Sequence, residues 1–419
     1  MRDAEGIRIA IGGIYMFYDS ELEKLKDKQS VHLDKTQYPR LGKIKMESFA
    51  FNNINTTLVK EEKVIILPNN ISSRIDDQEN IVVLKDGNII YTNLNDNFAG
   101  IKVSSYFDAL EQNDQEVLNI IQEHLATFDE DKLVTLNKMH LNSFLYINVP
   151  KNRVIKDALK VYVISSRDLA HETFINLEAN SELTLVESLE SLGPVNFNYI
   201  SETIVNDNAK LNYIGIDRLS DETTSYIGRY GYVKDDASLV YALGQLNDGN
   251  TFAKNHIKLI GRNSYAESRN VLFTDKDNTH VVLVNMEHLA PYSVGFINNH
   301  GIVKDKGYLF VDGIGKIHQG MNGSNSQQHT SIINLSDNAK VNANPFLLID
   351  EYDVNAGHGA AIGKVNEDQL YYLMSRGLSK RDAEKLIIYG FLTPVLELLT
   401  SENIRASFIK TIEKKLSVS

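Results

Sequence analysis

The sequence contains no cysteine and no tryptophan in 419 residues. The lack of cysteine excludes a disulfide framework, a thiolate nucleophile, and any zinc or iron–sulfur site held by sulfur atoms of this chain. A transmembrane span is also excluded, because the apolar stretch Ile9 to Tyr18 is far shorter than a bilayer requires, and it lacks a signal-peptide cleavage pattern. We therefore expect a cytoplasmic protein in which this stretch forms an amphipathic or buried helix.

The chain has fewer basic than acidic residues, with 43 Lys and Arg against 55 Asp and Glu, which gives a formal net charge of -12. Such a surface repels phosphate backbones, so nucleic acid is not an expected partner. The length predicts two to three domains, or one long repetitive body with attachments.

Residues 1–140 have a mixed character that predicts a small α/β region. One helix is expected over Tyr106 to Leu125 and a second from Asp129. The strand-like runs are Val64 to Leu67, Ile81 to Leu84 and Asn88 to Tyr91.

Residues 141–357 consist of short β-branched and aromatic runs separated by Asn, Asp and Gly. A unit of polar turn residues, a small residue and alternating apolar positions recurs, with Ser181, Ala209 and Ala237 each 28 residues apart. A fixed period of this size indicates a solenoid, and its strand-like composition favours a β-helix with Asn and Asp at the corners. A β-sandwich with evenly spaced turns is the alternative. Gly320 to Thr330 is expected to be an irregular insertion.

Residues 358–419 are predicted to form a C-terminal helical domain. Helices are expected over Glu367 to Arg376, over Lys380 to Tyr389 and from Glu402, with capping pairs at the first two and Gly377 at a helix end. The last helix carries an apolar stripe, which docks on its own domain or binds a partner. The stripe consists of Ile404, Phe408, Ile412 and Leu416.

Motifs of autonomous active sites are missing. The run Gly357 to Lys364 resembles a phosphate loop, but it has His358 where that loop needs glycine and Val365 where it needs Ser or Thr. There is no G-x-S-x-G, H-E-x-x-H or EF-hand pattern.

Three histidines stand out, because His300, His329 and His358 are spaced 29 residues apart. In a solenoid of similar period they could stack in one column and share a metal or a proton. Of the three, His358 lies between two glycines, where the backbone or a ligand can approach closely. A tight strand-to-helix turn with an incidental histidine explains the same glycines.

The C-terminal part of the sequence resembles the SufB/SufD family of the SUF iron–sulfur cluster assembly machinery, and within it the SufD branch. The resemblance covers roughly residues 140–400. Its segments are Asn344–Glu351 (NPFLLIDE), Gly357–Gly363 (GHGAAIG), Asp368–Ser379 (DQLYYLMSRGLS), Tyr146–Lys151 (YINVPK), Ala242–Asn250 (ALGQLNDGN) and Leu335–Lys340 (LSDNAK).

The resemblance implies a mainly β fold: a right-handed parallel β-helix flanked by an N-terminal α/β region and a C-terminal helical bundle. It implies a non-catalytic scaffold subunit that pairs with SufB as a heterodimer and docks the ATPase SufC. His358 matches the family histidine near the nascent cluster and is the tentative metal ligand. The implied SufC-docking region includes Arg376, Gly377, Lys385 and Tyr389. The chain alone would hold no cofactor, because the transient iron–sulfur cluster is shared with SufB and ATP is bound by SufC.

The missing cysteine favours the SufD branch, since SufB carries a functional cysteine and a glutamate where this chain has Gly359. Ala356 stands where several SufD proteins have cysteine, and alanine cannot ligate iron. The resemblance therefore leaves the imidazole of His358 as the expected cluster ligand from this chain. A homodimer formed without SufB is a further expectation. The alternative function is a β-helix polysaccharide lyase or hydrolase, whose candidate residues would be Asp217, Arg218, Arg229 and Asp248.

Overall fold

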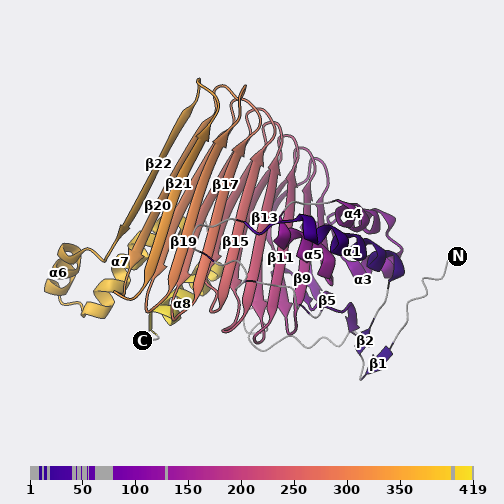
Figure 1. Cartoon of the computed structure of the whole chain (residues 1–419), viewed down its shortest axis with the longest axis horizontal. Helices are drawn as coiled ribbons and strands as arrows, with labels where there is room; N and C mark the ends of the chain where they lie inside the picture. Colours follow the sequence, from indigo (N-terminus) through magenta and orange to yellow (C-terminus); the bar gives the residue numbers. More distant parts are fainter. Residues whose placement is uncertain are drawn as a thin grey trace.

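The computed structural model describes residues 9–11, 14–16, 19–39, 44, 49, 54, 56–61, 79–127, 131–397 and 402–417. Its body is a parallel β-solenoid in which successive strands alternate between two facing sheets, and helices flank both ends (Figure 1). The fold class predicted from the 28-residue period is confirmed, and the sandwich alternative is wrong. None of the described helices is long and apolar enough to cross a membrane.

From β7 (Ser143–Val149) to β22 (Asn355–Gly363), successive strands belong alternately to the two sheets. The 10-stranded sheet runs in the order β22 (Asn355–Gly363), β20 (Asn325–Asn334), β18 (Val294–Val303), β16 (Tyr265–Thr274), β14 (Ser238–Gln245), β12 (Lys210–Arg218), β10 (Glu182–Ser191), β8 (Val154–Ser165), β4 (Asn80–Lys85) and β5 (Asn88–Asn93). The 9-stranded sheet runs in the order β21 (Lys340–Ile349), β19 (Tyr308–Ile317), β17 (Thr279–His288), β15 (Asn250–Leu259), β13 (Thr224–Val233), β11 (Asn196–Val205), β9 (Leu169–Leu177), β7 (Ser143–Val149) and β6 (Lys102–Ser105).

Corner residues explain the period. Asn180, Asn208 and Asp236 have φ angles of 59°, 55° and 54°, a left-handed conformation that Asn and Asp tolerate. The Asn208 side chain donates to the Asn180 side chain at 2.9 Å, so successive corners are joined by a ladder. These corners hold the strands in register, and Leu183 pairs with Leu211, which pairs with Leu239. The space between the sheets is filled by such apolar residues.

The helices at the N-terminal end cover the nine-stranded sheet (Figure 1). The helix expected over 106–125 is two helices, because Asn113 takes a left-handed conformation and Asp114 caps the second. The second predicted helix starts after Asp129, which lies outside the described residues, and has Asp131 as its N-cap. The helices are α1 (Ser20–His32), α3 (Tyr106–Gln112), α4 (Gln115–Ala126) and α5 (Lys132–His140), with short 3-10 turns η1 (Leu33–Lys35) and η3 (Asp96–Phe98).

The prediction of a helix over Ile9 to Tyr18 is wrong. Its described residues form the antiparallel strands β1 (Ile9–Ile11) and β2 (Ile14–Met16), and β2 also pairs with β3 (Val59–Glu61). Isoleucine favours strands, and the glycines at positions 12 and 13 of the sequence disfavour a helix. The expected strands at 81–84 and 88–91 are confirmed as β4 and β5, and the run Val64 to Leu67 lies outside the described residues.

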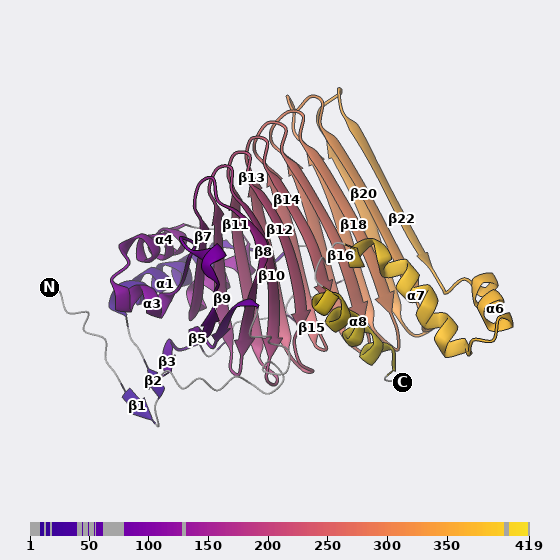
Figure 2. The ribbon, with the colours of Figure 1, turned by 180° about the vertical axis from the view of Figure 1, so that it is seen from behind.

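The C-terminal helices are α6 (Glu367–Ser375), α7 (Lys380–Leu396) and α8 (Glu402–Ser417), and α7 and α8 cover the ten-stranded sheet (Figure 2). The caps are as expected, since Asn366 accepts from the Gln369 amide and Ser379 from the Asp382 amide. Helix α7 continues past the predicted end at Tyr389, because Leu392 and Val395 pack against the solenoid.

The apolar stripe of α8 docks on its own chain. Ile404, Phe408 and Ile412 are buried against residues of β12 to β16. Gly244 of β14 is required there, because a Cβ atom would overlap the Phe408 ring. The interpretation of this stripe as a partner-binding surface is therefore wrong.

Two further boundaries differ from expectation. The insertion expected over Gly320 to Thr330 is confined to the corner before β20, where Gly320 and Gly323 have φ angles of 87° and 73°, and β20 starts at Asn325. The division into domains at residues 140 and 357 remains a prediction, although β22 runs through residue 357 to Gly363 and the helices begin at Glu367.

Candidate functional site

The C-terminal end of the solenoid is open, whereas its N-terminal end is capped. At the N-terminal end, the short antiparallel strands β5 and β6 close the two sheets. At the other end, the last strands are β21, with 10 residues, and β22, with 9, and no residue of either strand is buried. No other strand of the described chain pairs with their outer edges. Long unpaired edges are templates for pairing with another chain.

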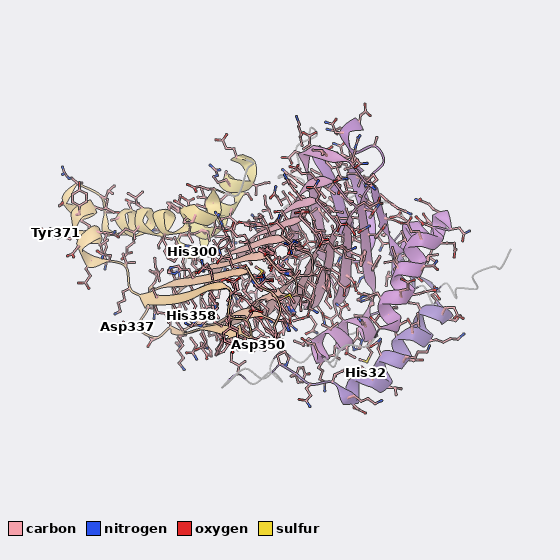
Figure 3. The ribbon with its side chains drawn as sticks, turned by 90° about the horizontal axis from the view of Figure 1, so that it is seen from above. His32, His300, Asp337, Asp350, His358 and Tyr371 are labelled. Carbon is pink, nitrogen blue, oxygen red and sulfur yellow. The ribbon has the colours of Figure 1, made fainter. Side chains whose placement is uncertain are left out.

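His358 lies in the middle of β22, the exposed edge strand. It pairs in register with Gln328 of β20, so both side chains point to the same face of the sheet. That face is the inner one, because the Gln328 side chain donates to Phe346 O and His358 Nδ1 lies 2.9 Å from Pro345 O, and both carbonyls belong to β21. His358 therefore bridges the two sheets at the open end of the solenoid. Figure 3 labels its position beside the last strands.

The contact with Pro345 fixes the chemistry of the ring. A carbonyl oxygen only accepts hydrogen bonds, so Nδ1 is the donor in this contact and Nε2 is the ring nitrogen that remains available. Nε2 makes no hydrogen bond within the described chain, and the side chain is exposed. A backbone carbonyl that orients an imidazole in this way is the usual outer contact of a metal-ligating histidine.

The prediction that His300, His329 and His358 stack in one column is wrong. His329 pairs with Gly359 and His300 pairs with Ser331, so His358 is out of line with both. Successive residues of a strand point to opposite faces, which places His300 and His329 on the outer face and His358 on the inner one. The His300 ring packs edge-on against Phe391 of α7, with centroids 5.1 Å apart, and burial lowers its pKa to about 4.

The glycines beside His358 open the outer face. Gly357 and Gly359 line a hollow of about 370 Å³ together with Phe296, Gln327 and His329. A Cβ atom at Gly357 would meet Oε1 at the end of the flexible Gln327 side chain, which would have to move. The alternative interpretation of these glycines as a strand-to-helix turn is wrong, because β22 continues to Gly363.

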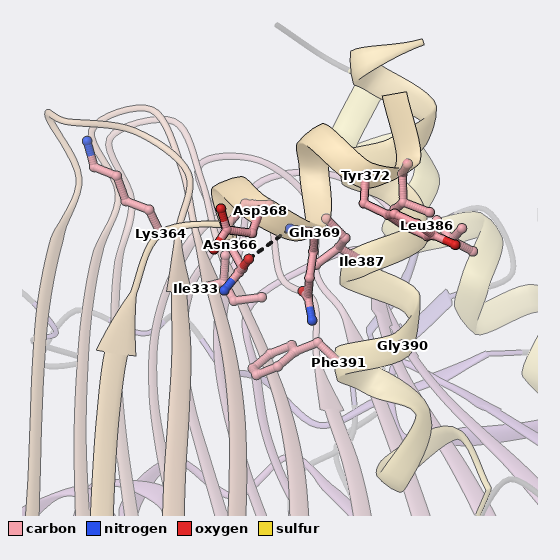
Figure 4. A pocket seen from close by; sticks show the side chains of 12 residues that line it. Ile333, Lys364, Asn366, Asp368, Gln369, Tyr372, Leu386, Ile387, Gly390 and Phe391 are labelled. Carbon is pink, nitrogen blue, oxygen red and sulfur yellow. Dashed lines mark hydrogen bonds between the residues drawn. The ribbon is translucent and has the colours of Figure 1, made fainter. Parts of the chain in front are cut away.

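A second feature of this end is a groove of about 750 Å³ between β20, α6 and α7 (Figure 4). Helix α6 has no buried residue, and several large apolar side chains on α6 and α7 face solvent. Exposed contiguous apolar surface of this kind is typical of a protein–protein contact. The exposed side chains are Tyr371, Tyr372, Met374, Leu378 and Leu386.

The four residues expected to dock an ATPase border this groove but do not line it. Arg376 is the exposed C-cap of α6 and lies 5.2 Å from the centre of the Tyr372 ring. Gly377 ends the helix with a φ angle of 97°. Tyr389 instead joins two helices, because its hydroxyl donates to Glu413 of α8 at 2.7 Å, and Lys385 lies half-buried on α7.

The sequence-based choice missed the apolar lining of the groove, above all Tyr372, Leu373 and Leu386. A signal was available, because Leu370 to Met374 is an almost continuous apolar run on a short helix, which leaves apolar side chains on every face.

The residues proposed for a carbohydrate-cleaving site do not form one. Asp217 and Arg229 are fully buried between the two sheets, where they form a two-point ion pair at 2.6 and 3.2 Å. Asp248 pairs with Lys415 of α8, and Arg218 donates to Ser407 of the same helix. No substrate on the outer surface could contact all four, so the choice of these four residues as a site is wrong.

Comparisons with known proteins give one consistent result. Residues 162–391 match the SUF system FeS cluster assembly, SufBD core domain. The chain is 33% identical over 393 residues to the iron–sulfur cluster assembly protein SufD of Bacillus subtilis, which covers 90% of each chain. It is also 23% identical over 332 residues to an iron–sulfur cluster assembly SufBD family protein of Staphylococcus epidermidis, which covers 76% of this chain and 70% of the relative.

Proposed function

We propose, from the premise that this chain belongs to the SufBD family of iron–sulfur cluster assembly proteins and is most similar to SufD, that it is a non-catalytic scaffold subunit. It pairs with SufB as a heterodimer, docks the ATPase SufC, and holds His358 close to the nascent cluster. The cluster is transient cargo shared with SufB, and ATP is bound by SufC.

One observation carries this proposal: His358 presents Nε2, the ring nitrogen not used in the contact with Pro345, at the open edge of the solenoid. Imidazole is an acceptable ligand for iron. Because the chain has no cysteine, the sulfur ligands come from SufB or from incoming sulfide.

The pairing surface for SufB is the edge formed by β21 and β22. The outer face of β21 exposes 44% of Phe346 and 49% of Leu348, and these apolar side chains would be buried by a partner beside the strand. Without SufB, the same edge pairs with a second copy of this chain, since one edge can serve both sides of a two-fold contact.

The docking surface for SufC is the groove between α6 and α7. Its apolar lining and the full exposure of α6 support this assignment. Removal of the residues after Ser379 would delete α7 and α8, which also cover the ten-stranded sheet, so substitutions within the groove test the docking surface more cleanly. Leu386→Asp, on the exposed face of α7, is expected to abolish SufC binding and to leave SufB binding intact.

The test is co-expression with SufB and SufC of the same host, followed by size-exclusion chromatography with mass determination. We expect one complex that contains all three chains. A lone monomer with affinity for neither partner would refute the scaffold role.

The role of the histidine is tested with His358→Ala and a matched control, His329→Ala. Both histidines are exposed on neighbouring strands, but they point to opposite faces. Both variants should fold and assemble, and only His358→Ala should slow cluster maturation, by about 10-fold or more, as expected for a lost metal contact. Wild-type maturation by His358→Ala would show that the assignment is wrong.

A further inference from the structure

A separate group of potential metal ligands lies at the other end of the molecule, between helix α4 and the nine-stranded sheet. His124 is in the last turn of α4, Glu172 is in β9, and Glu202 is in the neighbouring strand β11. The residues are far apart in the sequence and come together because the C-terminal end of α4 lies close to these two strands.

Each of the three residues places one potential ligand atom in the same small region. His124 Nε2 contacts a carboxylate oxygen of Glu172, and His124 Nδ1 lies 3.7 Å from Glu202 Oε1. One imidazole nitrogen and one oxygen of each carboxylate all lie within 4.8 Å of one another. Ligands of a tetrahedral zinc ion at about 2.1 Å lie roughly 3.4 Å apart, so small side-chain rotations would close the site.

Glu172 is the residue that needs a cation. It is fully buried, and neither of its carboxylate oxygens accepts a hydrogen bond. Its neighbours on the same face of the sheet are Phe174 and, in register on β11, Ile200, so the carboxylate sits in apolar surroundings. Its charged contact is with His124, but a buried carboxylate that accepts no hydrogen bond is costly, and a bound cation lowers that cost.

The surroundings favour a cation in two further ways. His124 lies in the last turn of α4, where the helix dipole is negative. The Glu202 side chain is 26% exposed, which gives a metal ion a path of entry and leaves room for water as a further ligand. The Lys138 ammonium group is engaged elsewhere, because it donates to the Thr127 carbonyl and hydroxyl at 3.2 and 2.8 Å.

We propose that His124, Glu172 and Glu202 bind one divalent transition-metal ion, best satisfied by zinc, which fastens the N-terminal helices to the solenoid. One imidazole and two carboxylates supply the nitrogen and oxygen donors that zinc accepts, and their two negative charges balance the ion. The site is structural, and it is independent of the cluster-proximal histidine in β22.

The experiment uses the untagged full-length chain, stripped with a chelator and then titrated with Zn²⁺. We expect one zinc per chain by elemental analysis, a dissociation constant below about 1 µM by calorimetry, and a melting temperature that rises with zinc. Substitution of Co²⁺ should give a visible ligand-field spectrum in the wild type. The variants His124→Gln and Glu172→Gln should lose zinc, with affinity reduced about 100-fold or more.

Glu202→Gln is the variant that guards against misfolding, because this side chain is partly exposed and its isosteric replacement leaves the contact between His124 and Glu172 in place. It should fold and bind zinc more weakly. His358→Ala should keep full zinc stoichiometry, which separates this site from the cluster-proximal one. Failure of the wild type to bind Zn²⁺ below about 10 µM, unchanged affinity in Glu202→Gln, or loss of zinc in His358→Ala would each overturn the proposal.

Discussion

Arg229 provides a quantitative test of how the solenoid tolerates charge in its interior. It is fully buried and makes an ion pair with Asp217 at 2.6 and 3.2 Å, and it lies 3.8 Å from Glu187. Its guanidinium also donates to the Tyr213 hydroxyl and lies 5.7 Å from the centres of the Tyr199 and Tyr213 rings. The change Arg229→Met keeps most of the volume and removes the only positive charge of this group.

The expected loss follows from what remains. Arg229→Met leaves two carboxyl groups between the sheets without their cation, which costs about 3–5 kcal/mol. This is a large share of a typical total stability of about 5–15 kcal/mol. Burial raises the pKa of Glu187, and the Arg229 charge opposes that rise. In the variant this pKa rises further, so protonation relieves part of the penalty, and the deficit is largest at neutral pH and shrinks as the solution becomes acidic.

Hydrogen exchange of the central strands measures this loss locally, and urea unfolding followed by circular dichroism measures it globally. A cost of 3–5 kcal/mol accelerates exchange by opening on the order of 10²- to 10³-fold. The triple variant Arg229→Met with Asp217→Leu and Glu187→Gln is the matched control, because it removes both carboxylates together with their cation, and replacing buried charges that pair with one another is often neutral. The reasoning would be refuted if the single variant lost less than about 1 kcal/mol, or if the triple variant were as unstable as the single one.

Three further predictions concern the surfaces of the solenoid. Contacts with His256, His318 and Lys316 lower the pKa of Glu287. The stabilisation that these contacts provide is therefore present above the unfolded pKa of Glu287 and is lost as the pH falls. Glu287→Gln should flatten the acid side of a plot of stability against pH, and an unchanged plot would contradict this. Phe408→Ala should cost about 3–5 kcal/mol and should make α8 sensitive to proteolysis, with no effect expected from Lys410→Ala on the same helix. Phe346→Asp should leave the melting temperature within about 2 °C of wild type and should abolish SufB pairing in size-exclusion chromatography; retained pairing would exclude β21 from the interface.

The features that sequence predicted correctly are local ones. Asn180, Asn208 and Asp236 set the coil period through their own backbone preference, and Asn366 and Ser379 start helices through their own side chains. The prediction of a histidine column was wrong because it assumed that every coil has the same number of residues. The register pairs Val294 with Asn325 and Asn325 with Asn355, which are 31 and 30 residues apart, so histidines spaced by 29 fall out of line.

Non-local packing was also outside the reach of a single sequence. Nothing near His124 in the chain predicts that two glutamates from separate strands face it, because the contact depends on how α4 crosses the sheet. Likewise, the inward direction of His358 depends on the register between β20 and β22. For this reason, the identity of the histidine came from family resemblance, and its orientation came from the structure.

The open end of the solenoid has an energetic consequence. In a stack where each coil contacts only its neighbours, stability is a sum of nearest-neighbour terms, and the last coil receives only one such term. The coil that carries His358 should therefore open at lower free energy than any coil behind it, and it should show the fastest amide exchange among the long strands. A partner that adds the missing neighbour converts this frayed end into an interior coil. Ordering of the strand that carries the histidine is thus coupled thermodynamically to assembly.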